Sequence, residues 1–191
     1  MSQFTITSSI EMNGNEINQI QYVTSEYLVT ESEGAFTLYN ATLNLFFEVD
    51  NVDEKLKPLV FEEQVQIASL KEVISQVIEI SEIETTKDFN GYTAVGKNYF
   101  KKLPSFEIDC KSWIGEISEL DNTCWSVGNL VNNQMQFIDF KLAPSQMLFE
   151  VDSCVFVGEQ MMISKSRIID INNSIDEHDK FMSFLNFEVV S

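Results

Sequence analysis

The residues best suited to chemistry by type and spacing lie near the C-terminus, in the stretch SIDEHDKF. It holds the one histidine of the chain, His178, beside the carboxylates of Asp176, Glu177 and Asp179. An imidazole among three carboxylates could bind a metal ion or relay a proton. Ser174 followed three residues later by Glu177 is, however, a capping box, and acidic side chains are favoured in the first turn of a helix. We therefore predict a helix start here, with His178 pointing to solvent.

The cysteines offer two further chemical possibilities. Cys124 and His178 could form a nucleophilic pair, and the three cysteines Cys110, Cys124 and Cys154 with His178 would supply four zinc ligands. A catalytic cysteine usually lies at a helix N-terminus, whereas TCWSVGNLV alternates like a strand. The spacing also lacks the close cysteine pair that structural zinc sites use. We predict buried structural cysteines, and neither catalysis nor a metal.

The sequence gives even less support to a metal site made of oxygen ligands or to a phosphate-binding loop. The loop DNVDE places Asp50, Asp53 and Glu54 together, but it lacks the glycine and the spacing of a calcium loop. No glycine-rich phosphate loop is present, and nothing singles out two carboxylates for glycoside chemistry. We therefore predict that the protein is not an enzyme and needs no cofactor.

The charge of the chain limits its partners. It has 30 acidic and 12 basic side chains, a formal net charge of −18, and Arg167 is its single arginine. Such a surface repels phosphate, so direct nucleic-acid binding is not expected. The acidity can serve solubility alone, or it can steer the protein toward a basic partner. The candidate partner-binding residues are the acids in and around two predicted turns: Glu31, Glu33, Asp50, Asp53 and Glu54.

The elements that would position these residues are mostly strands. FTITSSIEM, AFTLYNATLNLFFEVD, SFEIDCKSWIGEIS and MLFEVDSCVFVGEQMMI have strand patterns, with turns expected at Asn13-Gly14 and at residues 32–34. Ser69 and Glu72 begin the clearest amphipathic pattern, which predicts a helix over about 69–80, and a short C-terminal helix is expected over about 175–187. The predicted fold class is α+β, predominantly antiparallel β meanders with these two helices.

The chain also contains short internal echoes. FTIT at 4–7 resembles FEID at 106–109, and LFFEVD at 45–50 resembles LFEVD at 148–152. The stretch 84–104 is the least periodic and is the candidate linker. These features suggest two similar meander-plus-helix halves, 1–103 and 104–191. One continuous domain is the alternative. Trp113 and Trp125 are expected to form a cross-strand core pair.

Taken together, the residues favour a non-enzymatic acidic protein that binds or inhibits a basic protein, such as a toxin or a nucleic-acid enzyme, in the manner of immunity proteins or phage-encoded inhibitors. The alternative is a structural component, for example a phage virion or tail part, and an enzyme with an unrecognised carboxylate site is a third hypothesis. No segment is apolar enough to span a membrane and no secretory signal is evident, so a bacterial or host cytoplasm is expected. The sequence leaves the oligomeric state open.

Overall fold

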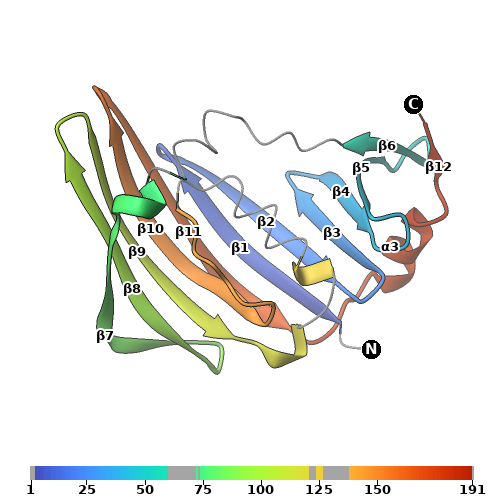
Figure 1. Ribbon diagram of the computed structural model, residues 1–191. Helices are drawn as coiled ribbons and strands as arrows, with labels where there is room; N and C mark the ends of the chain where they lie inside the picture. Colours follow the sequence, from blue (N-terminus) through green and yellow to red (C-terminus); the bar gives the residue numbers. More distant parts are fainter. Residues whose placement is uncertain (1–2, 60–71, 73, 121–123, 127–137, 191) are drawn as a thin grey trace.

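The computed structural model describes residues 3–59, 72, 74–120, 124–126 and 138–190. Within them the protein is built around a single 12-stranded sheet (Figure 1). The strands are β1 (Phe4–Met12), β2 (Asn15–Val23), β3 (Tyr27–Ser32), β4 (Ala35–Asn40), β5 (Leu45–Asp50), β6 (Lys55–Leu59), β7 (Glu79–Phe89), β8 (Tyr92–Leu103), β9 (Phe106–Glu116), β10 (Gln146–Val157), β11 (Gln160–Asn172) and β12 (Glu188–Val189). Two short helical elements are the 3-10 turn η1 (Ser118–Leu120) and α3 (His178–Phe184).

The strand order joins two meanders. It runs β12-β6-β5-β4-β3-β2-β1-β11-β10-β9-β8-β7, so strands that follow one another in the chain are mostly neighbours in the sheet. The antiparallel pairing of β1 with β11, from Thr5 opposite Asn172 to Met12 opposite Ser164, connects the first meander to the second. The two-residue strand β12 adds to the edge by pairing with β6 in parallel.

Five hairpins of the described residues have two-residue turns, and three of these turns share one conformation: Asn13-Gly14, Glu33-Gly34 and Asn90-Gly91. Both residues of each of these three turns have positive φ, between 50° and 87°. That combination defines a type I′ turn, whose twist matches the twist of the flanking strands. The predicted turns at Asn13-Gly14 and at 32–34 are therefore confirmed. The third turn lies in the expected linker 84–104, which instead forms most of the β7–β8 hairpin.

Different segments of the chain pack against the two faces of the sheet. On one face, which we call the helix face, Tyr27, Leu38 and Phe47 are buried with Phe181 and Phe184 of α3. On the other, which we call the loop face, Trp125 packs near Phe4 and Ile6, and Phe140 packs with Tyr99. Alternation along each strand produces this division, because successive side chains point to opposite faces.

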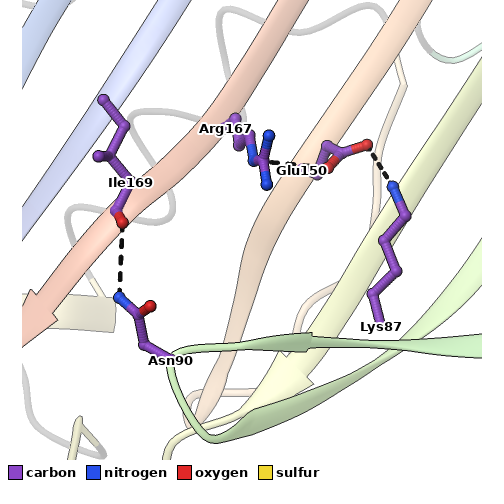
Figure 2. Close-up of polar contacts among 5 residues, drawn as sticks. All are labelled: Lys87, Asn90, Glu150, Arg167 and Ile169. Carbon is purple, nitrogen blue, oxygen red and sulfur yellow. Dashed lines mark hydrogen bonds and ion pairs between the residues drawn. The ribbon is translucent and has the colours of Figure 1, made fainter.

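The β7 end of the sheet curls over the helix face. The Nδ2 atom of Asn90, in the β7–β8 turn, donates to the carbonyl of Ile169 at 3.4 Å (Figure 2). The same atom donates to Oδ1 of Asp170 at 3.1 Å. Asp170 belongs to β11, and three strands separate β11 from β7 in the sheet order. The turn reaches back across that distance only because the sheet is strongly bent, as twisted sheets of many strands tend to be.

The predicted fold class is wrong in its helical part. The structure is mostly β, with 63% of it in strands, and the described residues include no clear amphipathic helix of the expected length. Of the helix predicted over 69–80, residues 69–71 and 73 lie outside the described residues, residues 72 and 74–77 are helical, and Glu79 already begins β7. From Glu79 onward the chain pairs with β8, so tertiary context overrides the helical pattern at the end of the predicted segment. The C-terminal helix is shorter than predicted, 178–184 instead of 175–187.

The expected boundary between halves, at 103/104, falls in the turn between β8 and β9, which pair along their length. The echoed segments 4–7 and 45–50 lie in β1 and β5, which three strands separate, whereas their counterparts lie in the adjacent strands β9 and β10. Strand pairing thus gives the proposed duplication no support. Trp113 and Trp125 are both buried, but they are no cross-strand pair, because Trp125 lies in a helical turn at 124–126.

Gly115 is closely packed by its neighbours, and this packing leads to a first prediction. A Cβ atom placed there would lie 2.5 Å from Cε2 of Phe149 and 2.9 Å from the carbonyl oxygen of Thr93. Because Phe149 is fully buried, its ring has little room to move. We expect Gly115→Ala to lower the free energy of unfolding by about 1–3 kcal/mol, as overpacking does. Urea unfolding would show a lower midpoint at unchanged slope, and Ser81→Ala on the exposed edge strand β7 is the control. Equal midpoints for the two variants would contradict this packing.

Candidate functional site

The hairpin turns at one end of the sheet gather the candidate partner-binding acids. Because neighbouring strands are antiparallel, the β1–β2, β3–β4 and β5–β6 turns all lie at the same end, along the upper side of Figure 1. Glu33 lies in the β3–β4 turn, and Asp53 and Glu54 lie in the β5–β6 turn, all three exposed. Two strand spacings separate these turns, about 10 Å. We call Glu33, Asp53 and Glu54, with Glu31 and Asp50 beside them, the acidic turns.

Two of these acids occupy an unusual backbone conformation. Glu33 and Glu54 have φ values of 52° and 53°, in the left-handed region. Side chains other than glycine lose stability there, and asparagine tolerates the region best. The other two type I′ turns of the protein do have asparagine at this position, Asn13 and Asn90. A glutamate at position 33 therefore does not serve the turn, which suggests a role for its carboxylate outside the fold.

The remaining two acids of the set have partners within the chain. Oδ1 of Asp50 accepts hydrogen bonds from the backbone N–H groups of Val52 and Asp53, both at 3.0 Å, and these bonds lower the pKa of its carboxyl. Glu31 accepts a hydrogen bond from the hydroxyl of Tyr22 at 3.1 Å. Burial, and then this carboxylate, raise the pKa of Tyr22 to about 12. Asp50 and Glu31 thus shape the turns and strands that carry the more exposed acids.

Many basic side chains lie on the helix face of the sheet, opposite acids. One row of cross-strand neighbours runs Glu11, Lys165, Asp152 and Lys111 over β1, β11, β10 and β9. Opposite charges facing one another across strands stabilise the pairing, and they also neutralise each other's field. In the middle of the sheet the acid excess is therefore reduced, whereas at the acidic turns the cation nearest to Asp53 is Lys55, at 3.8 Å.

Arg167 is part of a second charged row on that face. Glu150 accepts from Lys87 Nζ through Oε1 at 2.6 Å and lies 3.9 Å from Arg167 Nε through Oε2 (Figure 2). Lys87 also lies 3.5 Å from the centre of the Trp113 ring, a cation–π contact. These contacts link β7 to β10 under the curled hairpin. Sequence reasoning missed this cluster, because Lys87 and Glu150 are far apart in the chain.

The three cysteines are placed for structure rather than for reaction. Register puts Cys110 on the loop face, opposite Ser153, and Cys154 on the helix face, opposite Asp109. One zinc ion cannot bind both thiols, because they point away from each other across the sheet. Burial raises the pKa of Cys110 to about 12 and that of Cys124 to about 11. These shifts are opposite to those that activate a nucleophilic thiol.

His178 is placed differently from the prediction. Instead of pointing to solvent, its Nδ1 atom lies 2.8 Å from the hydroxyl of Tyr27 and its Nε2 atom 3.4 Å from Nε2 of Gln3. The imidazole stacks on the Tyr27 ring, with centroids 5.9 Å apart. The predicted capping box is also wrong: Glu177 is the N-cap of α3 and makes no side-chain cap bond. The imidazole therefore connects α3 to β3, a link that the spacing in the sequence did not indicate.

Metal sites and membrane-spanning helices are two further features to consider in the described residues. Among them, no three histidine, cysteine, aspartate or glutamate side chains are grouped as metal ligands would be. No helix in this part of the chain is long and apolar enough to cross a bilayer. The charge distribution favours the acidic turns as the candidate site.

Comparisons with known proteins add little to this picture. No protein-family model matches the chain, and no curated protein matches it. Two crystal forms of PNGF-II are similar in structure: the C2 form has a TM-score of 0.46 at 10% identity, and the P21 form 0.41 at 12% identity. Each comparison covers 100% of this chain and 31% of the other, so the chain spans about a third of the length of PNGF-II. Similarity of this degree carries no argument about activity.

The placement of the thiols leads to a second prediction. Cys154 is half-buried, whereas Cys110 and Cys124 are fully buried with strongly raised pKa values. In native protein at pH 8, we expect iodoacetamide to modify Cys154 alone, and all three cysteines in urea. Mass spectrometry of peptides would identify the site, and Cys154→Ser should abolish native labelling. Rapid native labelling of Cys124 would contradict the burial described here.

Proposed function

We propose that the protein is a non-enzymatic binding or inhibitor protein that engages a basic partner protein through the acidic turns. The observation that supports this proposal most directly is Glu33, a glutamate kept in a left-handed turn position where asparagine would suit the backbone better. Its carboxylate and those of Asp53 and Glu54 are exposed at one end of the sheet. Their fields overlap at moderate ionic strength, where the screening length is about 10 Å.

The charge of the whole chain supports the same proposal. With a net charge of −18, the protein attracts cationic partners over a distance and repels phosphate backbones and anionic membranes. A toxin or a nucleic-acid enzyme has the basic surface that such a protein would recognise. Binding of this kind needs neither a cofactor nor a nucleophile, and the bacterial or host cytoplasm is the compartment that we propose.

The third prediction concerns Glu33, where one substitution should raise the stability of the protein and weaken its binding to the partner. We expect Glu33→Asn to raise the free energy of unfolding, by up to about 1 kcal/mol, because asparagine tolerates left-handed φ better than glutamate. The same change should weaken partner binding, because it removes a carboxylate. Chemical unfolding and binding measured on one preparation would check both effects. A variant that is less stable than the wild type would contradict the conformational argument.

The fourth prediction tests the acidic turns directly. We expect a variant with Glu33→Gln, Asp53→Asn and Glu54→Gln to lose capture of a basic protein from the native cytoplasm, whereas Glu82→Gln, Glu84→Gln and Glu119→Gln should retain it. Both triple variants remove three exposed acids, so their net charges are equal. Association with the captured partner should slow steeply between about 0.05 and 0.5 M salt, as screening requires.

Two outcomes would count against the proposal. Equal loss of capture in both triple variants would mean that net charge acts without the acidic turns. Salt-independent self-assembly into large rings or tubes, seen by light scattering after size exclusion, would favour the alternative, a structural component of a larger assembly. Either result can be read without knowing the partner in advance.

A further inference from the structure

The loop face of the sheet contains a cavity of about 360 Å³. Its floor is formed by β1, β2 and β9–β11, and Trp125, Ile138 and Phe140 cover it from the other side. The volume lies within the range of small-molecule sites, about 300–1,000 Å³. None of the acidic turns lines it, so whatever it binds is independent of the proposed partner binding.

The exposed fractions of the residues that line the cavity show which of its ends is closed. Along β1, Ser8 is 8% exposed and Met12 is 57% exposed, and both line the cavity. Along β2 the cavity extends from Gln21, 6% exposed, toward the exposed strand residues near the β1–β2 turn. The cavity therefore opens toward that turn and ends beside Gln21 and Ser8.

The described wall carries no ionised group that faces the cavity. Arg167 is the one charged residue among those that line it, and its guanidinium pairs with Glu150 on the helix face. Cys110 stays a neutral thiol, since its pKa is raised to about 12. An ion without a counter-charge is strongly disfavoured in such a space. The occupant that fits is therefore uncharged.

The closed end offers one free hydrogen-bonding group. The side-chain amide of Gln21 is more than nine-tenths buried and has no hydrogen-bond partner within the described part of the chain. Buried polar groups are usually paired, and an amide can both donate and accept. Ile10, Ile108, Phe140, Met147 and Val155 make much of the remaining wall apolar. A small molecule with an apolar body and a single hydroxyl or carbonyl group complements this arrangement.

We propose that this cavity binds a neutral, largely apolar small molecule, such as a medium-chain alcohol, with its hydrogen-bonding group against Gln21. The apolar body then lies between the sheet and Phe140, and the open end near Met12 admits it. A molecule of the same length that ends in a carboxylate is rejected, because none of the described residues at the closed end neutralises its charge.

The test uses the neutral dye N-phenyl-1-naphthylamine, whose fluorescence rises in apolar surroundings. We expect saturable binding at one dye per chain, displacement by 1-decanol, and at least tenfold weaker displacement by decanoate at pH 7. The absence of saturable binding, as for a cavity filled by water, would overturn the proposal. Equal displacement by decanol and decanoate would also overturn it.

Two variants with a matched control locate the site. Ser166 lines the cavity, whereas Ser9 lies on the adjacent strand and points to the opposite face. We expect Ser166→Phe to weaken dye binding at least tenfold and Ser9→Phe to leave it unchanged. Gln21→Leu keeps the cavity volume and should weaken decanol binding roughly threefold to tenfold, the effect of one lost hydrogen bond. Unchanged decanol binding in Gln21→Leu, or unchanged dye binding in folded Ser166→Phe, would refute the assignment.

Discussion

The pairing of β1 with β11 is the contact on which the rest of the structure depends. Every other antiparallel pair in the sheet joins strands that follow one another along the chain, whereas this pair connects Phe4–Met12 to Gln160–Asn172. Without it, the described strands would form two separate meanders, each with an extra open edge. Residues so far apart in the chain meet only at an entropic cost, which the packing of the finished core must offset.

The pairing of β1 with β11 also determines which side chains lie on each face of the sheet. Through β1 and β11, the side chains of Ile6 and Ile171 join the loop-face core, while Glu11 and Lys165 face each other on the helix face. Much of the charge of the central strands is therefore balanced in place. Glu33, Asp53 and Glu54 lie exposed in turns at the end of the sheet, away from these rows of opposite charge, and the cavity lies on the loop face.

The strained turn at Glu33 and the amide of Gln21 are two places where local chemistry departs from what folding alone would select. At each place, a polar side-chain group has no hydrogen-bond partner among the described residues. The first is charged and exposed, which suits a macromolecular partner steered by charge. The second is neutral and buried, which suits a small molecule. The two proposals are independent because different faces and different forces support them.

Much of the strand content and several turns could be predicted from sequence, because alternation and Asn-Gly or Glu-Gly pairs are local signals. The acidic turns were found in the same way, since Glu33 and Asp53 lie in segments of plain turn composition. The end of the helix predicted over 69–80 and the linker predicted over 84–104 were wrong, because residues 79–103 pair as β7 and β8, and β8 pairs in turn with β9, contacts that local periodicity does not show.

The sequence by itself determined the features that depend on composition or on residues close together in the chain. These are the large acid excess, the lack of a phosphate-binding motif, the strand patterns and the turn residues. Only the tertiary structure decided that His178 binds Tyr27, that Cys110 and Cys154 face opposite sides, and that Gln21 closes a cavity. The physical reason is the same in each case. These contacts join residues on different strands, and the register that brings them together is set by the packing of the whole sheet.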